Sequence, residues 1–320
     1  MLHLRVVVPA DLTDRIVALL VADPAVSALS VARGAALKPV GDVIQADVAR
    51  EAANDIVEHL RDLHVPDVGT IHLEPVVTWM SRAGLEAQNL APGSPTDAVV
   101  WATVTQQAYD ESELNWSYGS FMTLATLLAG VAIIIDSPIL VIGAMVLGPE
   151  FTPIAALGVA LVRKRWNLFG QATRTLLGGF AVAMAFTTVV TLLGRALGWV
   201  ELADITGPRP GTHFIYSPDK WSFVVAVIAA AAGVLSLTSS RVGGLSGVFI
   251  SVTTIPAAAN VAVGLAFGAW DEILGSLAQL IVNLTGMAVA GWLVLALQQT
   301  VWQRVSAYRA KIMPTGKSGV

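Results

Sequence analysis

Six apolar segments dominate the carboxy-terminal two-thirds of the chain and leave few folds open to it. Their bounds are 119–135, 138–162, 172–198, 221–238, 244–268 and 273–300. A helix needs roughly 20 apolar residues to cross a bilayer, so each segment suits one crossing. Charged residues make up 13% of the chain, whereas soluble domains carry about 25%. We therefore predict an α-helical, multi-pass membrane protein with six spans.

The charged residues between these segments predict the orientation of the chain. With the amino terminus inside, the inner connections carry most of the Lys and Arg residues, including the run at 163–165. The outer connections carry Arg209, Lys220 and most of the acidic residues, among them Glu272. Cytoplasmic loops of membrane proteins are enriched in Lys and Arg, so we expect both termini to be cytoplasmic. The expected location is the plasma membrane.

Residues 1–80 have the pattern of a small soluble α+β domain. The predicted elements are strands at Leu2–Val8, Val26–Ala32, Gly41–Val48 and Thr70–Thr78 and helices at Asp11–Ala22 and Arg50–His64. Their order, β-α-β-β-α-β, is that of a ferredoxin-like fold. This fold serves many functions, so it proves none. We expect a cytoplasmic regulatory domain, without a ligand that the sequence names. Four histidines lie in this domain, but their spacing fits no metal site, so none is expected.

The rest of the chain divides into a linker and two similar halves. Residues 81–117 are predicted to be a polar linker and an amphipathic helix at Thr96–Tyr109. The predicted membrane segments are a first repeat at 118–200, an extracytoplasmic loop at 201–220, a second repeat at 221–303 and a basic cytoplasmic tail at 304–320. A shift of 103 residues places Pro153 on Pro256 and residues 155–156 on 258–259. With three spans per half, the second copy enters from the opposite face, as in the inverted repeats of many secondary transporters.

Two prolines interrupt the second span. Pro149 and Pro153 have no backbone N–H and clash with preceding carbonyls, so the helix is expected to break between about Leu147 and Pro153. Glu150 lies in this break. A carboxylate at membrane depth is costly and usually functional, with proton coupling or cation binding as natural roles. The alternative is that Glu150 lies near the interface and only caps a half-helix.

The fifth span is the counterpart of this break, with hydroxyl and amide side chains around Pro256. These groups are expected either to bind a polar substrate or ion of unknown identity, or simply to join packed helices. The residues that we expect to form the site are Pro149, Glu150, Thr152, Pro153, Thr253, Thr254, Pro256, Asn260 and Asn283. Asp136 lies at a span boundary, where its side chain is expected to reach water.

Several function classes do not fit this sequence. It has no cysteine, which excludes disulfides and thiolate chemistry, and its net charge of -4 argues against nucleic-acid binding. No arrangement of a nucleophile with a base and no phosphate-binding loop occurs in the spans. We therefore expect neither enzymatic activity nor a cofactor.

The segment Leu128–Arg165 resembles an uncharacterised bacterial and archaeal membrane family, domain-of-unknown-function family 389. The shared pattern is Asp-Ser-Pro-x-x-Val-Ile-Gly-Ala-Met-x-x-x-Pro-x-x-x-Pro followed by a basic loop. Residues 236–238, 255–258 and 282–286 are also similar to this family, and the resemblance covers about Thr96–Gln299. It implies the membrane fold but no activity.

Two functions are compatible with these observations. The leading hypothesis is a secondary transporter or permease for a small solute or lipid-like molecule, with its site at the broken second and fifth spans and Glu150 as the coupling group. The alternative is a membrane sensor or scaffold that does not transport. A homodimer in the lipid bilayer suits both hypotheses.

Overall fold

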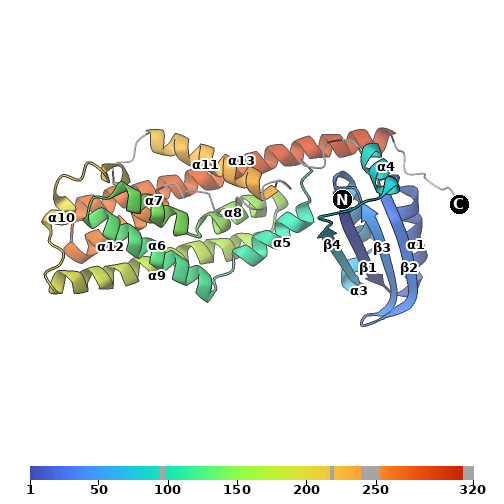
Figure 1. Ribbon diagram of the computed structural model, residues 1–320, viewed down its shortest axis with the longest axis horizontal. Helices are drawn as coiled ribbons and strands as arrows, with labels where there is room; N and C mark the ends of the chain where they lie inside the picture. The colour runs from blue at the N-terminus through green and yellow to red at the C-terminus, as the bar shows by residue number, and fades with distance from the viewer. Residues whose placement is uncertain (92, 94–97, 217–219, 239–252, 313–320) are drawn as a thin grey trace. The chain divides into compact units, whose positions relative to one another are not determined.

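The computed structural model describes residues 1–91, 93, 98–216, 220–238 and 253–312 (Figure 1). The chain forms two compact units. The first is built mainly from Met1–Val104 and the second mainly from Thr105–Leu237 and Val242–Leu297. Each unit has its own apolar core.

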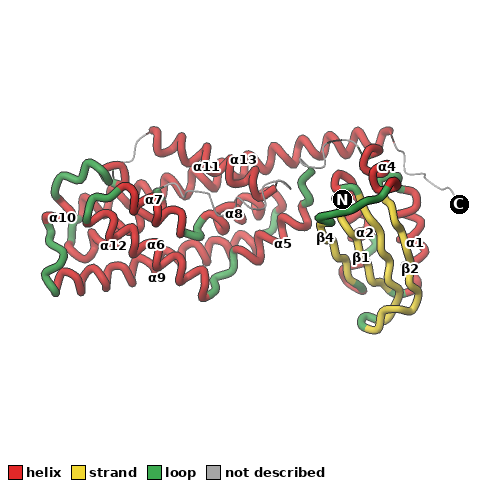
Figure 2. Tube along the Cα trace, in the orientation of Figure 1, coloured by secondary structure: helices red, strands yellow, loops and turns green. Residues whose placement is uncertain are grey.

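The amino-terminal unit contains a four-stranded antiparallel sheet (Figure 2). Its strands are β1 (Leu2–Val8), β2 (Val26–Leu37), β3 (Val40–Val48) and β4 (Thr70–Pro75), in the spatial order β2-β3-β1-β4. Alternate residues of β1, from Leu4 to Val8, join one core with apolar residues of helices α1 (Ala10–Ala22) and α2 (Ala53–Asp62). Both helices therefore cover the same face of the sheet. This unit is the α+β domain that the sequence predicts, with the predicted order of strands and helices.

The linker after this sheet is more ordered than the sequence indicates. Helix α4 (Arg82–Leu90) lies within the predicted polar linker, and its first turn is capped by the Ser81 hydroxyl, which accepts a hydrogen bond from the Gly84 amide at 3.0 Å. The amphipathic helix predicted from Thr96 is α5 (Trp101–Glu111), which begins later. Residues 94–97 lie outside the described residues.

Short helical turns and side-chain contacts complete this unit. The predicted helix at Arg50–His64 consists of η1 (Arg50–Ala52) and α2, and α3 (Val65–Val68) follows because His64 adopts a left-handed conformation. Asn54 holds the segment before α5: its amide nitrogen donates to the Val99 carbonyl at 2.7 Å, and its amide oxygen accepts from the Trp101 amide at 3.0 Å.

The second unit is helical. Its main helices are α6 (Trp116–Ile134), α7 (Pro138–Leu147), α8 (Phe151–Arg163), α9 (Trp166–Ala196), α11 (Lys220–Thr238), α12 (Thr254–Phe267) and the first part of α13 (Trp270–Ile312). The short helices α10 (Ala203–Thr206) and η2 (His213–Ile215) lie between α9 and α11. Within this unit, α6, α9 and α13 run along a common direction (Figure 2).

Three of these helices, α6, α9 and α13, are long and apolar enough to cross a membrane. The pair α7 and α8 makes a fourth candidate if the bent pair is counted as one span. Two shorter apolar stretches, Lys220–Leu235 of α11 and Thr254–Phe267 of α12, are not long enough to be candidates over the described residues. The structure thus contains a multi-pass membrane region with three or four candidate spans. Residues 239–252 of the predicted fifth span and its preceding loop, which include Arg241, lie outside the described residues, as do 313–320 of the predicted tail.

Helix α12 lies inside the helical unit. Twelve of its 14 residues are buried, whereas α9 exposes apolar side chains such as Val182 and Phe186. A helix that is buried on all sides must be surrounded by other elements. Its neighbours include α6, α7 and α9. Polar side chains on α12 are therefore enclosed by protein.

Candidate functional site

The second apolar span is broken, as predicted. Helix α7 ends at Leu147 and α8 begins at Phe151, and the two helices are bent by 51° at the break. Pro153 is the third residue of α8, where no intrahelical partner is needed for a backbone N–H. The proline therefore lies in the first turn of a new helix rather than inside a continuous one. Pro256 has the same place in α12, although the residues before Thr253 lie outside the described part of the chain.

Glu150 is the N-cap residue of α8 and is fully buried. Its carboxylate oxygen Oε1 accepts a hydrogen bond from the Thr254 hydroxyl at 2.7 Å. Thr254 is the first residue of α12, so this bond joins the break in the second span to the start of α12. Negative charge is favoured at a helix N-terminus, and here the carboxylate lies at the beginning of α8 and contacts the beginning of α12.

Thr253, the residue before Thr254, joins the start of α12 to α13. It is the N-cap residue of α12 and has a left-handed backbone with φ of 35°. Its hydroxyl oxygen accepts hydrogen bonds from the Asn283 amide nitrogen at 2.6 Å and from the Gln279 amide nitrogen at 3.3 Å. We call Glu150, Thr253, Thr254, Gln279 and Asn283 the Glu150 cluster. Four of its residues were predicted, and Gln279 was missed although it lies one helical turn before Asn283.

Asn260 belongs to a different group. Its amide nitrogen donates to Glu272 Oε2 at 2.8 Å and to the Ser276 hydroxyl at 2.7 Å. Arg209 completes this group, with Nη2 at 2.8 Å from Glu272 Oε2 and Nη1 donating to Asn260 Oδ1 at 3.3 Å. We call Arg209, Asn260, Glu272 and Ser276 the Arg209 cluster. The guanidinium also lies 5.0 Å from the centre of the Tyr216 ring.

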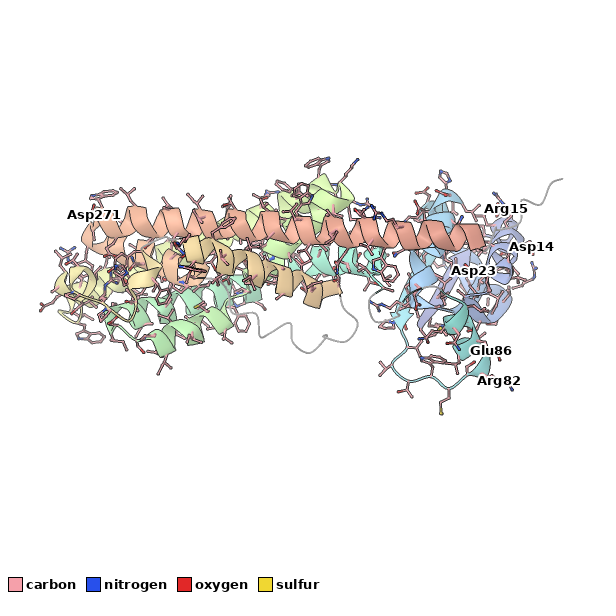
Figure 3. The ribbon with its side chains drawn as sticks, turned by 90° about the horizontal axis from the view of Figure 1, so that it is seen from above. Asp14, Arg15, Asp23, Arg82, Glu86 and Asp271 are labelled. Carbon is pink, nitrogen blue, oxygen red and sulfur yellow. The ribbon has the colours of Figure 1, made fainter. Side chains whose placement is uncertain are left out.

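The Arg209 cluster differs from the prediction. The sequence places Arg209 and Glu272 in solvated loops, yet their side chains are only 3% and 13% exposed. Glu272 follows Asp271, which is labelled in the first turn of α13 in Figure 3. The residue next to Asp271 thus turns inward and pairs with an arginine from the segment between α9 and α11.

The two clusters share one face of α13. Glu272, Ser276, Gln279 and Asn283 are spaced by four, three and four residues, which places them on the same side of a helix. Eleven residues of helix correspond to about 16 Å, roughly half the thickness of a hydrocarbon core. Ser276, Gln279 and Asn283 are fully buried. A buried polar face therefore runs from one cluster to the other.

The Asp-Ser-Pro motif has a structural role at the start of α7. Asp136 accepts hydrogen bonds from the Gly211 amide at 3.1 Å and from the Thr212 hydroxyl at 2.8 Å. Burial alone would raise the pKa of Asp136, but these bonds lower it below its ordinary value. Ser137 caps α7, and Pro138 occupies its first turn. The sequence predicts that the Asp136 side chain reaches water. In the structure this carboxylate is instead bound by Gly211 and Thr212, in the segment after α10.

Two other predicted groups have local roles. The Thr152 hydroxyl donates to the backbone carbonyls of Pro149 at 3.0 Å and Glu111 at 3.2 Å, so it supports the break. In the amino-terminal unit, His3 contacts Asp47 at 2.9 Å. Among the described residues, no group of three or more His, Cys, Asp or Glu side chains is arranged to hold a metal ion.

The fold and these clusters define a multi-pass helical membrane protein that carries an α+β domain and a buried polar site at a broken helix. Residues 145–289 match the family described as "Domain of unknown function (DUF389)". The chain therefore contains a DUF389 domain over these residues, which confirms the resemblance found in the sequence. This range includes both ends of the Glu150 cluster.

One curated relative also matches. The chain is 23% identical over 177 residues to "Uncharacterized protein MJ0678" of Methanocaldococcus jannaschii, and the match covers 55% of this chain and 52% of the relative. The chain thus spans about half the length of the curated relative it matches. No solved structure matches the chain.

Proposed function

We propose that the protein is a cation-coupled secondary transporter or permease for a small solute or lipid-like molecule. One observation carries this proposal: the fully buried carboxylate of Glu150 lies at a helix break in an apolar span and binds the first hydroxyl of α12. Backbone that leaves the helical conformation at membrane depth is tolerated where protein encloses it or where it lines a path. The break therefore marks the transport site.

A carboxylate has a property that neutral polar groups lack. An ionisable carboxylate in an apolar span is costly, and in membrane proteins such a group commonly serves to carry a proton or to bind a cation. Hydrogen bonds between helices are also formed by Thr, Asn and Gln, as Thr253 and Asn283 do here. Packing alone thus does not require an acid at position 150, whereas coupling to a cation does.

The bounds of the helices support an architecture of six spans in two inverted halves. Helix α8 begins at Phe151 and α12 at Thr254, 103 positions later. Helices α6 and α11 begin 104 positions apart, and so do α9 and α13. In this architecture α11 and α12 are parts of the fourth and fifth spans, and the start of α12 contacts the break in the second span, an arrangement that resembles the paired broken helices of many transporters. The α+β domain and both termini are then cytoplasmic.

Reconstitution tests this function. The full-length protein is placed in liposomes with an imposed pH or Na⁺ gradient, and uptake of radiolabelled amino acids, organic anions, amines and fluorescent lipids is measured. We expect gradient-dependent uptake of one class, and we expect Glu150→Gln to reduce it to the level of protein-free liposomes. Glu201→Gln, at an exposed acid, is the control and retains uptake.

The results separate the two functions. Unchanged uptake by Glu150→Gln removes Glu150 from the mechanism. No uptake of any class under either gradient favours the sensor or scaffold.

A further inference from the structure

The Arg209 cluster is a buried charge site outside the Glu150 cluster. Arg209 is 4% exposed, and Asn260 and Ser276 are fully buried. Its guanidinium is bound by a carboxylate, an amide oxygen and the face of a tyrosine ring. Carboxylates, amide oxygens and aromatic faces are all groups that attract cations. The arginine thus occupies a site with the chemistry of a cation-binding site.

Holding a loop in place does not explain this site. The segment that carries Arg209 is already joined to the start of α7 by the two hydrogen bonds that Asp136 accepts. A buried ion pair contributes little net stability compared with well-packed apolar residues, because both charges lose their hydration. An additional buried pair with Asn260 and Ser276 around it is therefore a costly anchor.

The position of the site gives it a different role. Glu272 is at the beginning of the buried polar face of α13, and Asn283 of the Glu150 cluster is near its other end. A cation that leaves Glu272 along this face meets hydroxyl and amide groups at Ser276 and Gln279 before it reaches Thr253. Glu272 and Glu150 are thus the carboxylates at the two ends of this run of polar groups.

We propose that Glu272, Asn260 and Ser276 form a second cation-binding site of the transport path, which the Arg209 guanidinium closes in this structure as a tethered cation. The ligand is a small monovalent cation, either a proton or Na⁺. It binds Glu272 when Arg209 moves away, and it is released toward Glu150 when Arg209 returns. This proposal rests on the proposed transport function and names the gate of its ion path.

Cation flux without any solute tests the gate. Full-length protein is reconstituted in liposomes, and H⁺ and Na⁺ movements are followed with a pH-sensitive and a Na⁺-sensitive dye under separate gradients. Arg209→Gln removes the positive charge that is paired with the buried Glu272 carboxylate. This leaves Glu272 open to a mobile cation, so we expect the leak of H⁺ or of Na⁺ to rise about tenfold or more. Adding Glu272→Gln to this variant is expected to abolish the leak.

Arg195→Gln is the matched control. Arg195 donates to the Ala266 carbonyl at 2.8 Å and lies over the Phe267 ring, and it forms no ion pair with a carboxylate of the described residues. It is expected to leave the leak at the wild-type level. Equal leaks in Arg209→Gln, Arg195→Gln and wild type overturn the gate. A leak specific to Arg209→Gln together with no solute uptake keeps the gate and rejects the transporter.

A second measurement covers the case in which Arg209→Gln does not fold. The chain contains no cysteine, so Ser276→Cys, a nearly isosteric change, places a single thiol in the site with Arg209 intact. We expect a cationic methanethiosulfonate reagent to label this thiol in liposomes, and we expect high Na⁺ at constant pH to slow the labelling, because a change of pH would alter the reactive thiolate fraction itself. Absence of labelling from both sides of the membrane overturns the proposal.

Discussion

The hydrogen bond between Thr254 and Glu150 gives the sharpest test of the site. Thr254→Val keeps the shape of the side chain but removes the hydroxyl that donates to Glu150 Oε1 at 2.7 Å. Hydrogen bonds to charged groups contribute about 1.5–3 kcal/mol, roughly 10- to 150-fold in an equilibrium constant. Both residues are fully buried, so solvent replaces this bond poorly. We expect the variant to lose this amount of stability and to lose gradient-driven uptake.

Two controls isolate the bond. Thr254→Ser retains the hydroxyl and is expected to behave nearly like wild type. Thr126 is also fully buried, but its hydroxyl donates to the Met122 carbonyl of its own helix at 2.8 Å. Thr126→Val is therefore expected to cost only about 0.5–1.5 kcal/mol, the range for neutral hydrogen bonds.

The assay is reversible unfolding of the full-length protein in mixed micelles, followed by the flux assay on each variant that folds. The reasoning is refuted if Thr254→Val is no less stable than Thr126→Val and transports at the wild-type rate. Such a result would mean that the carboxylate does not depend on its contact with α12.

Three further predictions concern other parts of the molecule. A Cβ at Gly158 of α8 would lie 3.2 Å from the backbone of Gly291 in α13, so Gly158→Leu is expected to cost about 1–3 kcal/mol by overpacking. Gly170→Leu, at an open position, is the control in the same thermal melt. Asn54→Ala removes two hydrogen bonds to the segment at the start of α5. Because this costs roughly 1 kcal/mol of local stability, we expect the amides of that segment to exchange about fivefold faster or more. Unchanged amide exchange would contradict this prediction. Hydrogen bonds from a backbone amide and a threonine hydroxyl lower the pKa of Asp42. A depressed pKa stabilises the fold above the ordinary value, near 4, and this stability is lost as the pH falls through the folded-state pKa. Protection of β3 amides, measured by exchange in the full chain, should thus decrease below about pH 4 in wild type but change less in Asp42→Asn.

Much of the fold could be predicted because its information is local. Short stretches of residues 1–80 predict each strand and helix separately, and all four strands occur in the predicted order. Helix α4 was missed, because its sequence has few apolar residues and its start depends on a single cap at Ser81. The number of spans cannot be decided from local sequence alone. It depends on whether a short apolar helix such as α12 forms one span together with a neighbouring segment of the chain.

The site was predicted in part for the same reason. Glu150, Thr253 and Asn283 are polar residues in apolar segments, so each is conspicuous alone. Their meeting in one cluster depends on how α8, α12 and α13 pack. Asn260 was predicted with them, but it lies about two turns further along α12 and pairs with Glu272 and Arg209 instead.

The sequence by itself determined the apolar helices and the break after Leu147, because hydropathy and the missing N–H of proline act within a few residues. Only the tertiary structure decided which charges are buried. Arg209 and Glu272 are 63 positions apart and have the composition of solvated loops around them, yet they form an enclosed ion pair. A charge leaves water only where another part of the chain supplies its partner, and helix packing alone decides where that happens.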